Sequence, residues 1–357
     1  MNTQPKKLVV RFKMWYHPIM AERFAREPDF ELRTCELTGS DVAAWATLGE
    51  AHAYQISSAK DEIPRHWFAT SALLERCPKL LCVSTNGAGY DTVDLPACTQ
   101  AGVLVVNQAG ANAQSVAEHT IGAMLDVSRR LAESDRLLRR KRGFSREDIM
   151  GREVTGKVLG LVGIGHIGRK VARMAAAFDM TVLAVDPYLS DEEIARRGAQ
   201  SVTLDELLER SDIVSLHCPR DPSTLNMIDA AAFARMKRGA IFITTARGGI
   251  HDEAALADAL ASGHLAGAGL DVWDIEPPPL DHPLLTMDNV VATYHTAGVT
   301  PEARATMGSY AADQIIDLLK GGYPPRLLNP EAWPRYAERF TTIISADLAA
   351  QPAASTS

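Results

Sequence analysis

Three glycines in one short turn are the residues whose spacing points most directly to chemistry. Gly163, Gly165 and Gly168 form a Gly-x-Gly-x-x-Gly run. In such a turn the first glycine permits a tight bend, the second lets a pyrophosphate approach the backbone, and the third lets the next helix pack close to the strand. The free N–H groups of that helix then face the phosphates. This spacing predicts a dinucleotide-binding turn if a strand precedes it and a helix follows it.

The flanking segments supply that context. An apolar, β-type run at residues 158–162 leads into the turn, a helical stretch at 169–178 leaves it, and a second apolar run at 180–185 ends at Asp186. A carboxylate in this place accepts hydrogen bonds from the adenosine ribose and repels a 2′-phosphate, which favours NAD over NADP. A glycine-rich turn in some other α/β protein would explain the glycines but not Asp186. We therefore predict an NAD site.

Three polar residues, each just beyond a predicted strand, have the chemistry to work beside a nicotinamide. Arg247 offers fixed N–H donors that polarise a carbonyl oxygen and pair with a carboxylate. His295 can give a proton to the developing alkoxide, or take it back in oxidation. Glu276, next to the imidazole, would favour the charged histidine and hold its ring. Singly, each is expected to be an ordinary ion-pair, loop or turn residue; together they form a complete set for carbonyl reduction.

Alternating strands and helices are predicted to position these residues. Before the glycine turn, we expect strands at 8–12, 80–83 and 103–106 and helices at 69–76 and 95–100. After Asp186 the alternation continues, with strands at 213–216, 240–243, 266–270 and 290–292 and helices at 205–210, 230–236 and 252–262. This pattern is typical of the α/β class with parallel sheets.

Two longer amphipathic patterns, at 115–138 and 301–319, predict helices that accompany the change from one α/β unit to the other. Ligands of open parallel sheets bind beyond the carboxyl ends of the strands. We therefore expect two parallel-sheet domains separated by a ligand-binding cleft.

The length and composition of the chain argue against several classes of function. A chain of 357 residues has room for two domains, and a formal net charge of −7 argues against a nucleic-acid-binding surface. Five cysteines without a Cys-x-x-Cys pair, with no leader and no long apolar run, predict a cytoplasmic protein that does not interact with membranes. The ten histidines lack metal-ligand spacing, so no metal site is expected.

Five segments in order make the chain similar to the D-isomer-specific 2-hydroxyacid dehydrogenase family over residues 8–342. These segments are 156–168, 217–219, 245–249, 270–277 and 295–298. The resemblance implies two Rossmann/flavodoxin-like parallel-sheet domains. A discontinuous substrate domain is expected at 1–117 plus 302–345, an NAD-binding domain at 118–301 and a disordered tail at 346–357. It also implies Arg247, Glu276 and His295 as the catalytic trio, and a homodimer formed through the coenzyme domains.

The resemblance further implies which residues contact NAD, with Asp271 near the carboxamide. They are Gly163, Gly165, His166, Ile167, Gly168, Asp186, Pro187, His217, Cys218, Pro219, Thr245, Ala246, Arg247, Asp271, His295 and Gly298.

A glycine-rich loop in the first part of the chain matches the family loop that holds the substrate carboxylate. It comprises Asn86, Gly87, Ala88 and Gly89, which would bind the substrate together with Arg247 and His295. Consecutive N–H groups in such a turn make an anion nest, so the chemistry agrees with the resemblance. The alternative is a tight turn that serves geometry alone.

Departures from the family pattern bear on the substrate. Thr85 stands where one branch of phosphoglycerate dehydrogenases carries arginine, which argues against a phosphorylated substrate. The pair Ser84-Thr85 is more similar to glyoxylate and hydroxypyruvate reductases. Glu276 argues against formate dehydrogenase, which carries glutamine at this place. His119 is expected to be structural.

Two aromatic segments leave alternatives open. Trp15, Tyr16 and His17 either line the substrate cleft or pack against the helix that follows them, and the segment 329–336 is expected to pack in the core.

Together these features predict an NAD-dependent oxidoreductase that transfers a hydride between nicotinamide and a small, unphosphorylated 2-keto or D-2-hydroxy acid. One alternative keeps the same residues but uses another hydride donor, such as phosphite or a sugar acid. Another is a non-enzymatic, NAD-sensing protein similar to corepressors of this family.

Overall fold

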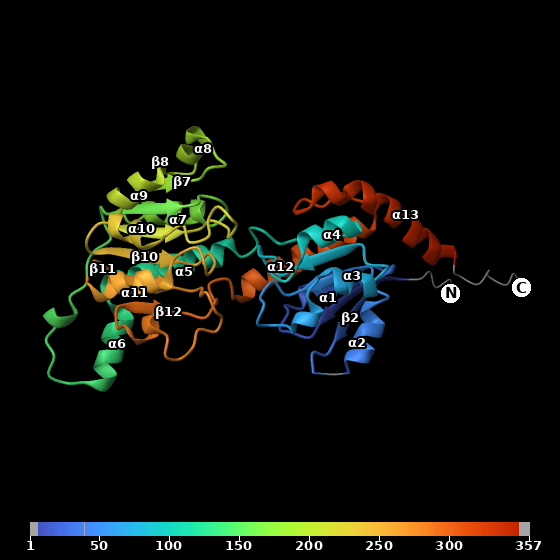
Figure 1. Ribbon diagram of the computed structural model, residues 1–357, viewed down its shortest axis with the longest axis horizontal. Helices are drawn as coiled ribbons and strands as arrows, with labels where there is room; N and C mark the ends of the chain where they lie inside the picture. The colour runs from blue at the N-terminus through green and yellow to red at the C-terminus, as the bar shows by residue number, and fades with distance from the viewer. Residues whose placement is uncertain (1–5, 39, 350–357) are drawn as a thin grey trace, which may run out of the picture. The chain divides into compact units, whose positions relative to one another are not determined.

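The structure, a computed structural model, describes residues 6–38 and 40–349 (Figure 1). The chain divides into two compact units: unit 1 runs to Asn112 and resumes at Thr300, and unit 2 comprises Ala113–Val299. The predicted boundary after residue 117 falls inside a helix that belongs wholly to unit 2. The predicted boundary after 301 likewise falls inside a helix, one that belongs to unit 1.

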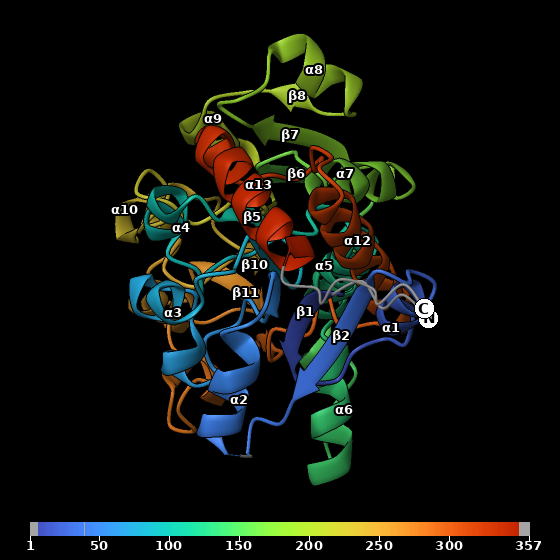
Figure 2. The same ribbon diagram turned by 90° about the vertical axis from the view of Figure 1, so that its right-hand side faces the viewer.

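Unit 1 contains a five-stranded, wholly parallel sheet in the order β2-β1-β3-β4-β5. Its strands are β1 (Lys7–Phe12), β2 (Phe30–Cys35), β3 (Ala53–Ile56), β4 (Cys82–Thr85) and β5 (Leu104–Val106). Its helices are α1 (Ile19–Ala25), α2 (Asp41–Leu48), α3 (Ser71–Arg76), α4 (Leu95–Ala101), α12 (Pro301–Leu319) and α13 (Trp333–Ala349). Figure 2 shows β1 and β2 side by side, with α1 next to α12.

Two apolar clusters hold the unit 1 sheet between helical layers. On one face Trp67 and Tyr54 are fully buried among residues of α2, α3 and the strands. On the other face α12 and α13 cover β1, β4 and β5. Trp333 packs there against the rings of Tyr323 and Tyr336, at centroid distances of 4.7 and 5.2 Å, which confirms the core packing expected for the segment 329–336.

The predicted disordered tail begins four residues too early, because α13 runs to Ala349 and residues 346–349 belong to it. The remainder of that prediction, 350–357, lies outside the described residues.

Unit 2 contains a seven-stranded, wholly parallel sheet in the order β12-β11-β10-β9-β6-β7-β8. Its strands are β6 (Val158–Val162), β7 (Thr181–Val185), β8 (Gln200–Ser201), β9 (Ile213–Leu216), β10 (Ala240–Thr244), β11 (Leu265–Leu270) and β12 (Val290–Ala292). Its helices are α5 (Ala113–Arg129), α6 (Leu131–Arg140), α7 (Gly168–Ala176), α8 (Asp191–Arg196), α9 (Leu204–Arg210), α10 (Ala230–Arg235) and α11 (Glu253–Ala261).

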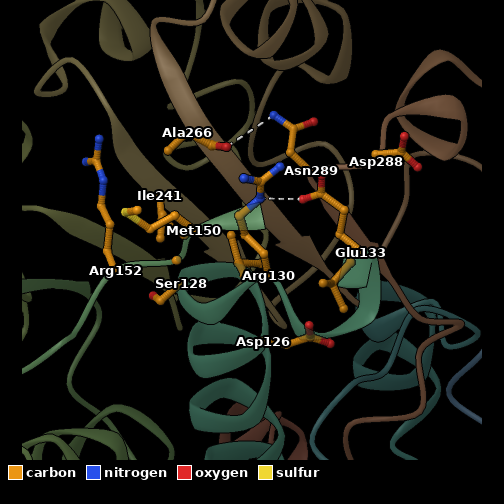
Figure 3. A pocket seen from close by; sticks show the side chains of 13 residues that line it. Asp126, Ser128, Arg130, Glu133, Met150, Arg152, Ile241, Ala266, Asp288 and Asn289 are labelled. Atoms are coloured by element: carbon orange, nitrogen blue, oxygen red, sulfur yellow. Dashed lines mark hydrogen bonds and ion pairs between the residues drawn. The ribbon is translucent and has the colours of Figure 1, made fainter. Parts of the chain in front are cut away.

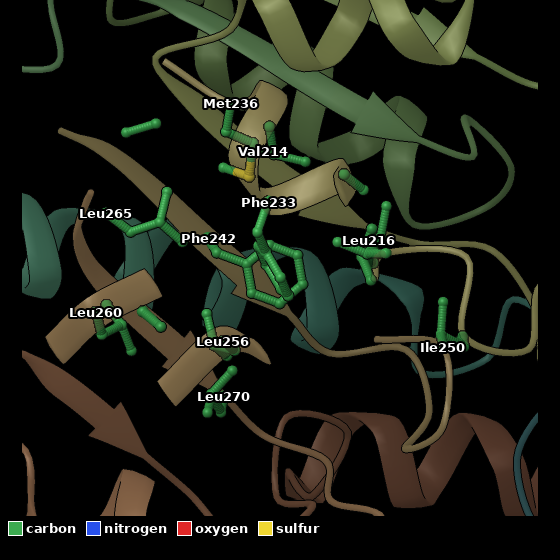
Figure 4. Close-up of a cluster of buried hydrophobic side chains, with 14 of the residues drawn as sticks. Val214, Leu216, Phe233, Met236, Phe242, Ile250, Leu256, Leu260, Leu265 and Leu270 are labelled. Atoms are coloured by element: carbon green, nitrogen blue, oxygen red, sulfur yellow. The ribbon is translucent and has the colours of Figure 1, made fainter. Parts of the chain in front are cut away.

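Helices cover both faces of the unit 2 sheet, as parallel sheets require. Residues of α5 and α7 bury one face, and those of α9, α10 and α11 bury the other. In the second layer Phe233 of α10 meets Phe242 of β10 edge-to-face, with ring centroids 5.2 Å apart (Figure 4). The sheet is therefore a rigid base for the loops at its carboxyl edge.

The single helix predicted at 115–138 is wrong, because the chain breaks at Arg130 into α5 and α6. Arg130 adopts a left-handed backbone conformation with φ +55°. The carboxylate of Asp126 accepts the Ala132 N–H at 2.7 Å, and so caps the start of the second helix. The apolar periodicity continues across the break, which is why the pattern alone does not reveal it. No residue of α6 is buried, and the helix projects from unit 2 (Figure 1).

Candidate active site

The predicted site residues of unit 2 lie in order along the carboxyl edge of its sheet. Because all seven strands are parallel, their carboxyl ends meet at one edge. Asp186 follows β7, and the glycine turn follows β6. His217 follows β9, and Arg247 follows β10. Glu276 comes after β11, and His295 comes after β12. An elongated ligand along this edge would therefore meet Asp186 towards one end and the trio towards the other.

The three glycines have the geometry that their predicted roles require. Gly163 has φ +93°, and a Cβ there would lie 2.9 Å from the backbone nitrogen of Cys218. A Cβ at Gly168 would lie 2.3 Å from the carbonyl oxygen of Gly163, so that only glycine lets α7 start this close to the strand. At Gly165 a Cβ would meet nothing within 4 Å. The open space at this position, beside the start of α7, fits a dinucleotide's pyrophosphate.

The carboxylate of Asp186 is half-buried and holds the glycine turn. Its Oδ2 accepts the Ile164 N–H at 3.1 Å, and its Oδ1 accepts the Tyr188 N–H at 3.2 Å. Each oxygen keeps a second lone pair for a ribose hydroxyl. Among the neighbouring predicted contacts, His166 and Pro187 are exposed, whereas Ile167 packs against the apolar cluster beneath α7.

The middle of the edge is uncharged. Burial lowers the pKa of His217 to about 4 and raises the pKa of the Cys218 thiol to about 11. His217 Nε2 lies 3.0 Å from the hydroxyl of Ser215, while its buried Nδ1 has no hydrogen-bond partner among the described residues. Pro219 is exposed. The hydroxyl of Thr245 is buried 3.2 Å from that of Thr120.

At the far end of the edge, the structure brings His295 and Glu276 together. His295 Nδ1 lies 2.9 Å from Glu276 Oε2, and Glu276 Oε1 accepts the Trp273 N–H at 3.1 Å. Burial by itself raises the pKa of Glu276. The opposing effects are larger and leave this pKa below its usual value: they come from the hydrogen bond and charge of His295, from the Trp273 N–H and from the charge of Arg247. The carboxylate is therefore ionised at neutral pH. With Nδ1 engaged, Nε2 is the histidine atom left to exchange a proton.

Asp271 folds the loop that carries His295. Its carboxylate is 1 % exposed and accepts three hydrogen bonds, from the Thr293 hydroxyl at 2.6 Å and from the N–H groups of Thr296 and Ala297 at 2.8 and 3.0 Å. The Asp271 carbonyl also accepts the His295 N–H at 2.7 Å. These bonds hold His295 in a left-handed conformation with φ +46°. The sequence points to Asp271 only as a cofactor contact, because such a loop bond depends on tertiary folding.

Two further predicted residues border this loop. His119 of α5 lies 3.1 Å from the Thr293 hydroxyl through Nε2, which agrees with the structural role expected for it. Gly298 follows the loop and is half-buried.

The loops that carry Arg247 and Glu276 are pressed together. A Cβ at Gly248 would lie 2.0 Å from the carbonyl oxygen of Trp273, so only glycine fits there. The Gly249 N–H donates to Asp274 Oδ1 at 2.5 Å. Arg247 itself donates from Nη1 to the carbonyl of the buried Ala246 at 2.7 Å. The positions of the trio are thus fixed by contacts between their own loops.

In unit 1, the predicted carboxylate-binding loop has its carbonyl groups occupied. Those of Asn86, Gly87, Ala88 and Gly89 accept hydrogen bonds from, in order, the Ser58 hydroxyl, the Gln108 N–H, the Asn107 side chain and the Thr85 hydroxyl. The N–H groups of Ala88 and Gly89 have no acceptor in the described part of the chain. Two consecutive free donors are what an anion nest requires.

One cavity lies away from these residues (Figure 3). It sits near the amino ends of β10, β11 and β12, where Arg130 pairs with Glu133 and the Asn289 side chain donates to the Ala266 carbonyl at 3.1 Å. Its polar groups thus bind one another, and it contains none of the predicted site residues.

A smaller pocket lies within unit 1. It is lined by Tyr16, His17, Met20, Asn86, Arg304, Met307, Gly308 and Ala311. Tyr16 and His17 therefore line a pocket, whereas Trp15 is 63 % exposed and does not. The sequence does not predict Arg304; its only signal is a cation in the first turn of the predicted helix 301–319.

Comparison with known proteins agrees with this geometry. The family model for the D-isomer specific 2-hydroxyacid dehydrogenase NAD-binding domain matches residues 121–297. A glyoxylate reductase of Thermofilum pendens is 40 % identical over 263 residues, which cover 72 % of this chain and 78 % of that protein. The chain belongs to the D-isomer specific 2-hydroxyacid dehydrogenase family. Unit 2 is the NAD-binding domain of this family member.

Other similar proteins differ in length or in the substrate they are named for. A D-3-phosphoglycerate dehydrogenase of Archaeoglobus fulgidus is 41 % identical over 249 residues, 70 % of this chain but only 47 % of that protein. The chain thus spans about half the length of the phosphoglycerate dehydrogenases it matches. The structure of a D-lactate dehydrogenase of Aquifex aeolicus, complexed with NAD and lactic acid, has a TM-score of 0.77 and 27 % identity, with 90 % of this chain and 99 % of that chain covered.

No described helix is both long and apolar enough to cross a membrane. The described residues also contain no group of three or more histidine, cysteine or acidic side chains placed to hold a metal ion.

Proposed function

We propose that this 2-hydroxyacid dehydrogenase family member is an NAD-dependent oxidoreductase of a small, unphosphorylated 2-keto or D-2-hydroxy acid, similar to glyoxylate or hydroxypyruvate. The observation that carries the proposal is the 2.9 Å contact between His295 Nδ1 and an ionised Glu276, beside Arg247 and at the opposite end of the edge from Asp186. A proton donor, a group that stabilises its charged form and a fixed cation are what carbonyl reduction requires of the protein.

The residues divide the chemical work. Arg247 pairs with the substrate carboxylate and polarises the C2 carbonyl. In unit 1, the free N–H groups of Ala88 and Gly89 offer a binding place for a carboxylate. His295 Nε2 delivers the proton to the C2 oxygen as its negative charge develops, and Glu276 stabilises the imidazolium that supplies this proton. Bound NADH supplies the hydride.

Asp186 supports a preference for NAD over NADP. Its carboxylate, fixed by the Ile164 and Tyr188 N–H groups, disfavours a 2′-phosphate placed on the adenosine ribose. The related D-lactate dehydrogenase of Aquifex aeolicus was solved with NAD, in keeping with this assignment.

Thr85 supports an unphosphorylated substrate. Its side chain is fully buried, and its hydroxyl donates to the Gly89 carbonyl at 2.8 Å. The residue therefore braces the carboxylate-binding loop and brings no cation to it, as an arginine in this place would.

A homodimer through unit 2 is part of the proposal. The segment from α6 to residue 150 exposes Leu131, Leu138 and Met150, by 55, 57 and 67 %. Apolar side chains gathered on one projecting segment are typical of a protein interface.

Five free cysteines fit a reducing cytoplasm.

A substrate panel tests the proposal. Purified protein is mixed with NADH or NADPH and with glyoxylate, hydroxypyruvate, pyruvate or 3-phosphohydroxypyruvate, and in a separate arm with phosphite and NAD. We expect NADH-dependent reduction of the unphosphorylated acids. Oxidation of phosphite alone would assign the other hydride donor, and an absence of turnover in every arm would contradict an enzymatic role.

A further inference from the structure

The unit 1 pocket lies where a parallel sheet of this topology binds ligands. Tyr16 and His17 follow β1 and Asn86 follows β4, so the pocket is at the carboxyl edge of the sheet. In the order β2-β1-β3-β4-β5, the chain that leaves β1 continues to β2 on one side, whereas the chain that leaves β3 continues to β4 on the other side. Such a switch point leaves a crevice beyond the strand ends, because the connections on its two sides run over opposite faces. α12 closes the pocket with Arg304 and Met307.

Arg304 contributes to this pocket a positively charged side chain with a buried nitrogen that lacks a hydrogen-bond acceptor. Its Nε is buried and has no hydrogen-bond acceptor among the described residues. A buried N–H without an acceptor is destabilising, and charged donors more so than neutral ones. An acceptor supplied by a ligand would remove this penalty. The buried nitrogen therefore points to an anionic binding partner.

None of the other polar side chains that line the pocket is a carboxylate. His17 Nδ1 accepts the Ile19 N–H at 3.2 Å, so the ring proton is on Nε2. Burial raises the pKa of Tyr16 to about 12, which keeps its phenol protonated at neutral pH. The Asn86 Oδ1 accepts a hydrogen bond from the Gln55 side chain at 3.0 Å, and the Asn86 side chain is also hydrogen-bonded to Tyr16.

The local charge also favours an anion. The guanidinium of Arg11 lies over the Tyr16 ring, 4.4 Å from its centroid, so two arginines act on Tyr16. The opposing charge is Glu62, whose carboxylate accepts a hydrogen bond from the Ser57 hydroxyl. The charged groups that act on Tyr16 are thus two arginines and one carboxylate.

The pocket adjoins the loop to which we assign the substrate carboxylate. Asn86 both lines the pocket and begins the 86–89 loop. On the other side Met307 approaches the same loop, since a Cβ at Gly87 would lie 3.7 Å from its sulfur. A molecule anchored at the free N–H groups of Ala88 and Gly89 therefore needs only a short chain to reach Arg304.

We propose that this pocket binds a second carboxylate, at the end of the substrate remote from C1, so that the preferred substrates are short 2-keto dicarboxylic acids and their 2-hydroxy counterparts. One planar guanidinium matches one carboxylate in a bidentate pair. The reaction in this inference rests on the proposed function, but the binding of a dicarboxylate does not.

Matched acids of equal length test the proposal. The kcat/KM with NADH is measured for 2-oxopentanedioate and for 2-oxopentanoate, which differ only in the terminal carboxylate, and for glyoxylate, which has no tail. We expect the dicarboxylate to be preferred over its monocarboxylate partner. In Arg304→Met, its kcat/KM should fall about 30- to 100-fold, mainly through KM, as the loss of a charged hydrogen-bonded pair implies. Glyoxylate reduction should change little, and Arg304→Lys should retain part of the preference.

Arg23→Met is the matched control, since Arg23 pairs with Asp313 at the surface and does not line the pocket. Its ratio between the two acids should equal that of the wild type. Equal losses for all three acids in Arg304→Met, or a preference of the wild type for 2-oxopentanoate, would overturn the proposal. So would a preference for 3-phosphohydroxypyruvate, which would assign the pocket to a phosphate.

A binding measurement separates this inference from the proposed reaction. Pentanedioate, which has no reactive carbonyl, is titrated calorimetrically into wild-type protein and Arg304→Met, with pentanoate as the comparison. Binding of pentanedioate that Arg304→Met weakens supports the pocket even if no keto acid is reduced, in which case only the proposed reaction fails. Equal binding of the two acids, or no binding of either, overturns the pocket assignment.

Discussion

At the scale of single residues, the chemistry depends on groups whose hydrogen bonds are already made within unit 2. Glu276 uses one oxygen for His295 and the other for the Trp273 N–H, and Asp271 uses both oxygens for the loop that carries His295. Such preorganisation lowers the cost of reaching the transition state, since the groups need not reorient during the reaction. Catalytic geometry is therefore sensitive to residues that never touch the substrate.

Replacement of Asp271 tests that sensitivity. Asp271→Asn keeps the size of the side chain but has one acceptor oxygen in place of two, so it cannot hold the Thr296 and Ala297 N–H groups together with the Thr293 hydroxyl. We expect the free energy of unfolding to fall by about 1–3 kcal/mol and kcat to fall at least about tenfold. Chemical denaturation and steady-state kinetics measure the two effects. Asp288→Asn, at a carboxylate that is 75 % exposed, is the control, and equal behaviour of the two variants would contradict the positioning role.

At the scale of elements, the sequence predicts unit 2 closely and unit 1 incompletely. The strands β6, β9 and β12 and the helix α12 have the predicted bounds, because each is a continuous apolar or amphipathic run bounded by turn residues. β2 and β3 are absent from the prediction. β2 is an edge strand with a largely polar face, and β3 is four residues long and includes the buried Gln55. Their burial comes from tertiary contacts that local periodicity does not record.

The residues of the candidate sites likewise include some that the sequence predicts and one that it does not. Arg247, Glu276, His295 and the glycine turn follow recognisable strands, so their placement at one sheet edge is predictable from parallel topology. Arg304 is not, because its significance comes from a buried nitrogen without an acceptor, which only the folded chain reveals.

Two alanine substitutions in the glycine turn should affect different properties. Gly168→Ala should lower the stability of the protein, and Gly165→Ala should weaken cofactor binding. In Gly168→Ala the new Cβ would lie 2.3 Å from the Gly163 carbonyl oxygen, so α7 must move, and we expect a loss of about 1–3 kcal/mol of unfolding free energy. In Gly165→Ala the Cβ meets no protein atom, so stability should change by less than about 0.5 kcal/mol. That methyl group instead occupies the proposed pyrophosphate space.

Thermal unfolding and NADH fluorescence titration measure these effects. Gly165→Ala should weaken NADH binding at least about tenfold while the melting temperature stays constant. Unchanged NADH affinity in this variant would contradict the placement of the pyrophosphate at the turn.

At the scale of the whole molecule, stability should depend on pH through buried histidines. Burial lowers the pKa of His251 to about 4, and its ring nitrogens have no hydrogen-bond partner among the described residues. Between that value and the ordinary 6.5, the unfolded chain binds a proton that the folded chain excludes. Stability is therefore present above pH 6.5 and is lost as pH falls towards 4.

His251→Leu removes this proton linkage. We expect the variant to lose less stability than the wild type between pH 6.5 and 4, by on the order of 3 kcal/mol at the acid end. Urea denaturation at a series of pH values measures the difference. His66→Gln, at a histidine whose side chain is 47 % exposed, should follow the wild type. Parallel pH profiles for wild type and His251→Leu would contradict the assignment.

The proposed homodimer is tested at the same scale. Leu138 is 57 % exposed on α6, and Leu138→Glu would place a charge in the proposed interface. We expect light scattering coupled to gel filtration to give the mass of a dimer for the wild type and a shift towards monomer for the variant. Val42→Glu, at an 80 % exposed position of unit 1, should remain dimeric. A monomeric wild type would refute the proposed assembly.

The most direct test of the central claim is single-turnover reduction of a 2-keto acid by NADH in His295→Ala. We expect this variant still to bind NADH, because the glycine turn and Asp186 are untouched, while the rate of NADH oxidation falls by at least about 100-fold. Glu276→Gln, which keeps the side chain but loses its charge, should fall less. NADH oxidation at the wild-type rate in His295→Ala would contradict the assignment of His295 as the proton donor.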